Sequence, residues 1–109
     1  MKRIEIIIPH SSMSQAINEL ELLGLHFTHY EVKGKGKAPT LAVEYNRGTS
    51  TMMEEYSTNI SISTVVTDSI VDNVIQRILR IGDSEGKIFV YEALDAIDIK
   101  SKRRGEFAL

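Results

Sequence analysis

An α+β fold is predicted by the order in which hydrophobic periods change along this 109-residue chain. Four segments show the two-residue alternation of β-strands, and two segments show the spacing of amphipathic helices. Their order is strand, helix, strand, strand, helix, strand, followed by a further short segment. Strands and helices in this order form an antiparallel sheet with both helices on one face, which is the ferredoxin-like arrangement.

The first half of the chain supplies a strand, a helix and a second strand. "RIEIII" at residues 3–8 alternates isoleucines along one face, and Pro9 ends the strand. Residues 12–24 change to helical spacing, with Ser12 and Gln15 as a capping box and Gly24 as the C-cap. Aromatic and β-branched residues at 25–33 predict the second strand.

The second half repeats the pattern with a strand at 59–66, a helix and a strand at 86–93. Asp68 is the expected N-cap of this helix, and Gly82 follows its end. Residues 95–101 are expected to form a short fifth strand. The whole chain, residues 1–109, is interpreted as one domain.

Two features exceed the minimal fold. The segment at 34–58 between the second and third strands is longer than ordinary connections, and such segments are usually functional or disordered. The sheet face away from the helices must carry Ile7, together with either Phe89 and Tyr91 or Ile88 and Val90. An apolar uncovered face predicts burial against another subunit.

Composition excludes several classes of function. The formal net charge is -2, which argues against a general nucleic-acid surface. The chain has no cysteine, so thiol chemistry and zinc–thiolate sites are excluded. His26 and His29 point to opposite faces of the expected strand and are not expected to bind one metal together. With no nucleophile or metal-protease motif, no catalytic residue is assigned. Nothing resembles a signal peptide, so a cytoplasmic location is expected.

Three basic clusters interrupt this acidic chain. "EVKGKGK" at 31–37 alternates lysine with glycine, "GK" at 86–87 opens the last main strand, and "KSKRR" spans 100–104. Glycine allows a backbone to approach a phosphate closely, and lysines add a local positive field. The clusters predict a composite anion site if the fold or a neighbouring subunit brings them together.

At these residues the sequence resembles the PII (P-II) signal-transduction proteins. The similarity rests on "EVKGKG", on "YNRG" at 45–48, on "GKIFV" at 86–90 and on the closing "AIDIKSKRRGE". The resemblance implies a non-enzymatic homotrimer that binds an adenine nucleotide between subunits. It also implies a T-loop, here residues 37–58, that engages a target protein such as a membrane transporter or a metabolic enzyme.

The resemblance also implies which residues would form the nucleotide site. The residues expected at the base of the long segment are Gly34, Lys35, Gly36 and Lys37, and those expected near the nucleotide base are Ile7, Thr28 and Val65. Gly86 and Lys87 are expected at the phosphates, and Lys100 and Arg103 are expected to come from a neighbouring subunit.

This chain departs from the family pattern at three places. Lys37-Ala38 stands where the family has arginine and glutamine, the "GDGK" turn is stretched over 82–87, and Asp98 replaces an arginine and would repel a phosphate. Two alternatives therefore stay open: an assembly protein with a vestigial ligand site, and an RNA-binding domain of the same element order.

Overall fold

The computed structural model describes residues 1–34, 57–81 and 85–109. Within these ranges four strands form one antiparallel sheet in the order β2-β3-β1-β4. The strands are β1 (Lys2–Pro9), β2 (Thr28–Gly34), β3 (Ser57–Val66) and β4 (Lys87–Glu92). Helices α1 (Met13–Leu22) and α3 (Val71–Leu79) follow β1 and β3. The predicted ferredoxin-like order is confirmed.

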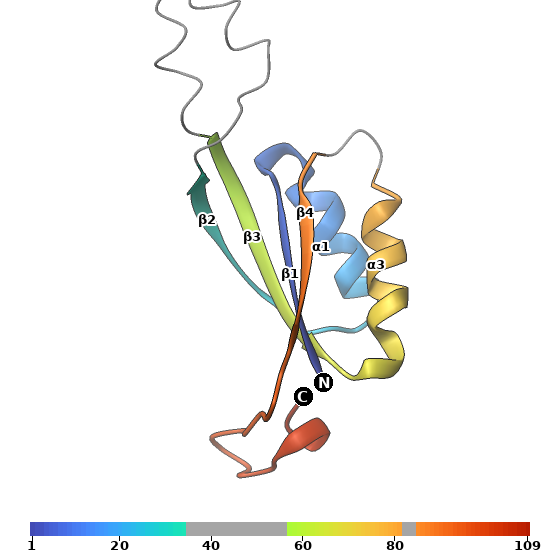
Figure 1. The fold of residues 1–109 in the computed structure, drawn as a ribbon, viewed down its shortest axis with the longest axis vertical. Helices are drawn as coiled ribbons and strands as arrows, with labels where there is room; N and C mark the ends of the chain where they lie inside the picture. The colour runs from blue at the N-terminus through green and yellow to red at the C-terminus, as the bar shows by residue number, and fades with distance from the viewer. Residues whose placement is uncertain (35–56, 82–84) are drawn as a thin grey trace, which may run out of the picture.

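Both helices cover the same face of the sheet, as Figure 1 shows. The core between the two layers is apolar, because alternate strand residues and one stripe of each helix turn toward it. Each large aliphatic side chain buried here contributes about 1.5–3 kcal/mol relative to exposure. The buried hydrophobic residues are Ile4, Ile6, Ile8, Ala16, Leu20, Ile60, Ile62, Val66, Val74 and Ile78.

The ends of α1 agree with the sequence at one terminus only. Gly24 has φ +71, and its N–H donates to the Glu21 carbonyl while the Leu25 N–H donates to Leu20, which is the expected glycine C-cap. At the other end, a 3-10 turn at His10–Ser12 leads into the helix. Ser12 is the N-cap of α1, as its place in the sequence pattern predicts, but it already has helical backbone angles and makes no side-chain capping bond, so the hydrogen bond of the predicted capping box is absent.

The helix α3 also begins differently from the prediction. Asp68 opens a 3-10 turn at Asp68–Ile70, and Ile70 is the N-cap of α3. The Asp68 carboxylate instead lies 3.0 Å from the Met1 amino group and 3.3 Å from Lys2 Nζ. Lys2 also pairs with Glu92 at 2.8 Å. Asp68 therefore pairs with cations at the start of the chain rather than capping the helix.

The final segment is an arm rather than a fifth strand of the sheet. Beyond β4 the chain leaves the sheet and turns back on itself, at the bottom of Figure 1. Only Ile97 forms a β-bridge, with Arg104, and a 3-10 turn at Gly105–Ala108 follows. We call residues 93–109 the C-terminal arm. None of the described helices is long and apolar enough to cross a membrane.

The register decides which side chains occupy the open face of the sheet. Ile7 is paired with Ser61 on β3 and with Lys87 on β4, and paired residues share a face. Phe89 and Tyr91 therefore lie on the open face with Ile7, whereas Ile88 and Val90 turn toward the helices. This settles the alternative that alternation along the strand left open.

Candidate functional site

Gly86 packs closely against the backbone of β1. Gly86 has φ +138, and a Cβ built on it would lie 2.1 Å from the Ile7 carbonyl oxygen. Both the left-handed backbone and the missing space require glycine here. The structure thus explains the first residue of the "GK" pair by packing against Ile7, which is itself an expected site residue.

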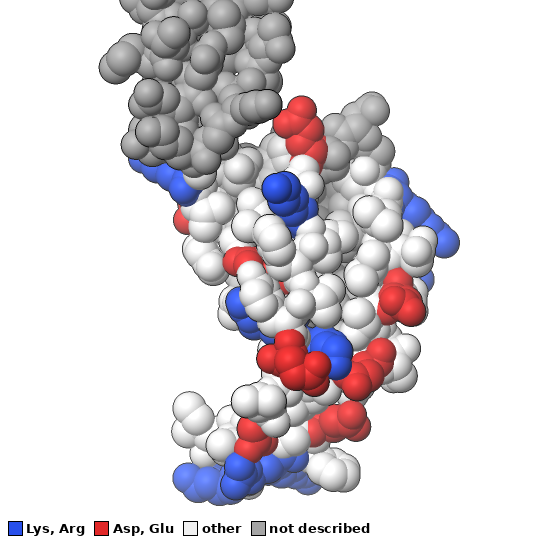
Figure 2. Space-filling model, in the orientation of Figure 1, with Lys and Arg blue, Asp and Glu red and all other residues white. Residues whose placement is uncertain are grey.

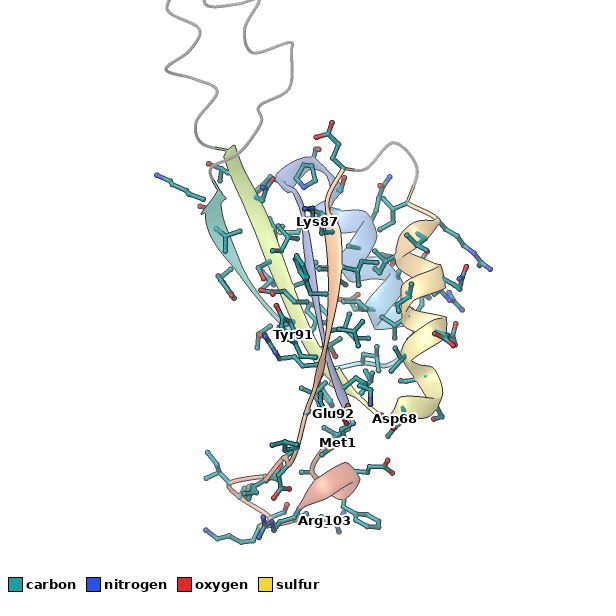
Figure 3. All side chains as sticks on the ribbon, in the orientation of Figure 1. Met1, Asp68, Lys87, Tyr91, Glu92 and Arg103 are labelled. Carbon is teal, nitrogen blue, oxygen red and sulfur yellow. The ribbon has the colours of Figure 1, made fainter. Side chains whose placement is uncertain are left out.

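Lys87 follows directly and presents a cation at the same place. It is the first residue of β4, is exposed and lies opposite Ile7 in the register. Figure 3 shows it near the upper end of β4, far from Arg103 in the arm. Ile7, Gly86 and Lys87 are therefore brought together within one chain, and they combine an apolar side chain, a closely packed glycine backbone and a positive charge.

The base of the long segment lies at the same end of the sheet but on its other edge. Gly34 ends β2 and pairs with Ser57, the first residue of β3. Two strands, β3 and β1, separate it from β4. Lys35, Gly36 and Lys37 lie outside the described residues, as do most of 34–58 and Gly82.

Thr28 and Val65 are not in contact range of Ile7 within one chain. Val65 lies four residues along β3 from Ser61, the partner of Ile7, which corresponds to about 13 Å of strand. Thr28 pairs with Ser63, so it is a diagonal neighbour of Val65 on the same open face. The expected base-binding residues thus divide into Ile7 and a separate Thr28–Val65 pair.

Lys100 and Arg103 lie farther away, in the C-terminal arm. Both are exposed, and the arm continues from the end of β4 opposite Lys87. Figure 2 shows basic side chains gathered over the arm at the bottom of the molecule. One chain therefore does not bring its three basic clusters together.

A charged network occupies the open face between these two groups. The Glu5 carboxylate accepts hydrogen bonds from Ser61 Oγ at 3.0 Å and Tyr91 Oη at 3.1 Å. The Arg3 guanidinium stacks over the Tyr91 ring, 4.2 Å from its centroid. The hydrogen bond to Glu5 raises the pKa of the Tyr91 phenol. Sequence reasoning missed this network, although Arg3 and Glu5 interrupt the alternating isoleucines.

Asp98 is engaged by its own turn. Its Oδ1 accepts the backbone N–H groups of Lys100 at 2.9 Å and Ser101 at 2.8 Å. The Ser101 N–H, more than any other group, lowers the pKa of this carboxyl. The carboxylate expected to repel a phosphate therefore has a local structural partner.

A groove of about 390 Å³ lies beside this site on the helix-covered side of β4. It is lined mainly by aliphatic side chains of α3 and β4, with Glu85, Gly86 and Lys87 at one end. In the described part of the chain, no group of three His, Asp or Glu residues is arranged to hold a metal ion. This end of the sheet therefore places the exposed Lys87 and the carboxylate-bearing Glu85 next to an apolar groove.

Comparisons with known proteins agree over the full chain. The sequence profile of the family described as "Nitrogen regulatory protein P-II" matches residues 1–103. A "Nitrogen regulatory protein P-II" of Rhodospirillum rubrum is 33% identical, with 100% of each chain covered. The protein of that name from Klebsiella oxytoca is 29% identical, again with 100% of both chains covered. A "Nitrogen fixation nifHD1 region GlnB-like protein 2" of Methanosarcina barkeri is 30% identical, covering 100% of this chain and 99% of its own.

Proposed function

The chain belongs to the nitrogen regulatory protein P-II family, and from this premise we propose that it is a homotrimeric sensor of adenine nucleotides. AMP, ADP or ATP binds between neighbouring subunits, and residues 37–58 then engage a target protein such as a transporter or a metabolic enzyme. The protein acts by binding and not as an enzyme. Ligand-linked ordering of a segment is an established form of such regulation.

The division of the expected site into two groups carries this proposal. Ile7 and Val65 are both expected beside the nucleotide base, yet about 13 Å of strand separates their rows in one chain. That distance exceeds the width of an adenine ring. A single base can contact both kinds of residue only if Ile7, Gly86 and Lys87 come from one subunit and Thr28 and Val65 from its neighbour.

The C-terminal arm fits the second group. It leaves β4 at the end where Val65 and Arg3 share a row with Tyr91. This position supports the proposal that Lys100 and Arg103 accompany Thr28 and Val65 into the neighbour's site. We call Ile7, Gly86 and Lys87 the first half-site, and Thr28, Val65, Lys100 and Arg103 the second half-site.

Exposed apolar side chains support association of identical subunits. Phe89 and Tyr91 on the open face are 39% and 40% exposed, and Leu94, Ile99 and Phe107 of the arm are 93%, 87% and 80% exposed. Surfaces of this kind usually mark interaction sites. A closed ring of three copies buries the same surfaces in every subunit.

Gly34 fixes the start of the long segment at the end of the sheet where Lys87 lies. β2 and β3 remain paired up to Gly34 and Ser57, so the intervening segment starts and finishes at one point of the sheet. That point lies at the sheet end where Lys87 begins β4 (Figure 3). A nucleotide that contacts one conformation of the segment better than another shifts its population.

Calorimetry with AMP, ADP and ATP tests nucleotide binding directly. We expect Lys87→Ala to weaken binding more than Lys35→Ala, because Lys87 is held beside Gly86 and Ile7. Equal affinities for the two variants contradict the phosphate role of Lys87. An absence of binding by any nucleotide favours the assembly-protein alternative, and salt-dependent RNA binding favours the RNA-binding alternative.

Mixed trimers test whether each site is shared between subunits. Lys87→Ala disables the first half-site, and the double variant Lys100→Ala/Arg103→Ala disables the second half-site. Refolding the two variants together at equal concentration should restore roughly one site in four, since each restored interface needs one intact half from each variant. Recovery of no sites contradicts the shared-site arrangement. Refolding Lys87→Ala alone is the matched control and should restore none.

A further inference from the structure

The C-terminal arm contains a turn whose shape depends on one acidic side chain. Ile97 and Arg104 pair across it, the Asp98 N–H donates to the Arg103 carbonyl at 2.9 Å, and the Lys102 N–H donates to the Asp98 carbonyl at 2.8 Å. Within this frame the Asp98 side chain accepts the N–H groups of Lys100 and Ser101. Asp98 therefore makes four hydrogen bonds to the backbone of residues 100–103, two through its own main chain and two through its carboxylate.

Two other properties of the turn disfavour its shape. Lys102 has φ 67, a left-handed conformation that side chains other than glycine and asparagine disfavour. Four of the five residues at 100–104 are cationic, and their mutual repulsion also favours an open loop. Arg104 is paired with Asp95, but Lys100, Lys102 and Arg103 have no ion-pair partner among the described residues.

We propose that Asp98 is a positioning residue for the phosphate-binding cations of the arm. It fixes the backbone from which Lys100 and Arg103 extend, so that both enter the neighbouring subunit's site in a preformed arrangement. Binding then avoids the entropy cost of ordering a mobile basic loop. The proposal rests on the nucleotide-binding function proposed above, and it assigns Asp98 the opposite effect from simple repulsion of the ligand.

Two substitutions at Asp98 separate positioning from charge. Asp98→Asn keeps an oxygen that can accept the two N–H groups but removes the charge, whereas Asp98→Ala removes both. In calorimetry with ATP, we expect Asp98→Ala to bind about 10-fold more weakly and Asp98→Asn to bind within about 3-fold of wild type. Glu106→Ala is the matched control, because it removes a carboxylate from the same arm outside the turn, and it should not weaken binding.

Repulsion predicts a different result, since both Asp98 variants would then bind ATP more tightly than wild type. That outcome overturns the proposal, and so does equal weakening by Asn and Ala, which would show that the charge rather than the turn matters. Equal weakening by Glu106→Ala likewise overturns it. Circular dichroism and the oligomer mass should be unchanged in all three variants, because Asp98 and Glu106 belong neither to the core nor to the apolar side chains proposed to join the subunits.

A measurement without nucleotide keeps this inference distinct from the proposed function. Amide hydrogen exchange at Lys100 and Ser101, followed by NMR on the full chain, should be slow in wild type and Asp98→Asn but fast in Asp98→Ala. Unchanged exchange in Asp98→Ala refutes the role of Asp98 in holding the turn, whatever ligand binds. If the wild-type protein binds no adenine nucleotide, the proposed function is refuted. The role of Asp98 in nucleotide binding is then refuted as well, whatever the exchange measurement shows for the turn.

Discussion

Replacing Gly86 by alanine tests the contact that joins the first half-site to the core. The new methyl group would lie 2.1 Å from the Ile7 carbonyl oxygen, and it would also lie 3.1 Å from the Ile7 carbonyl carbon and from Ile8 Cγ2. Two of these three atoms belong to the β1 backbone and the third to a buried side chain, so none can move easily to make room for the methyl group. The clash therefore has to be relieved by moving the start of β4 away from β1.

The expected loss of stability has two parts. Alanine at φ +138 lies in a region almost restricted to glycine, which costs about 1–3 kcal/mol. Overpacking against fixed neighbours adds about 1–3 kcal/mol. We expect a total of about 2–6 kcal/mol, which lowers the melting temperature by roughly 8–25 °C for a chain of this size.

Gly24→Ala is the matched control for backbone strain alone. Gly24 has φ +71, and a Cβ there meets nothing within 4 Å, so only the left-handed conformation is penalised, by about 1–2 kcal/mol. Thermal and urea unfolding of both variants should be compared at one protomer concentration, because association changes apparent stability. If Gly86→Ala is no more destabilising than Gly24→Ala, the close approach to Ile7 is refuted.

Three further changes probe the core and the ion pairs. Ile62→Ala, at a fully buried position, should lose about 2–5 kcal/mol in urea unfolding and Ile62→Val only about 0.5–1.5; equal losses would contradict tight packing there. Thr64 Oγ1 donates to the His26 carbonyl at 2.7 Å, so Thr64→Val should cost about 1–3 kcal/mol, while Thr64→Ser keeps the hydroxyl and should cost less. The Met1 amino group and Lys2 lower the pKa of the Asp68 carboxyl from its ordinary value. The folded pKa is depressed, so the pairing stabilises the fold above the unfolded value, and this contribution is lost as the pH falls through the folded pKa. Asp68→Asn should remove that part of the acid sensitivity, and an NMR titration showing an ordinary Asp68 pKa would contradict the pairing.

The main elements were predictable because local hydrophobic period reflects one buried face. Alternating isoleucines identified β1, and the apolar stripe after Asp68 identified α3. Helix starts were less predictable, since Ser12 and Asp68 have side chains suited to capping but both belong to 3-10 turns here. Whether such a side chain caps a helix or binds a distant partner depends on what the tertiary structure places beside it.

The sequence could nominate candidate site residues but not their arrangement. Glycine-lysine pairs carry a local chemical signature, so Gly86 and Lys87 could be recognised in the sequence. Their distance from Val65 follows from strand register, which a local pattern does not specify. Glu5 and Tyr91 were missed for the same reason, because they meet only through the pairing of β1 with β4.

By itself, the sequence determined the order of strands and helices, the apolar face of each and the three basic clusters, since these depend on residue types at short spacings. The tertiary structure decided that Phe89 and Tyr91 share the open face with Ile7 and that Gly86 touches β1. It also decided that Asp98 faces its own turn. These features depend on strand register and on contacts between residues brought together by the fold. Such contacts contribute to stability only when the sheet has formed, so a local sequence pattern does not reveal them.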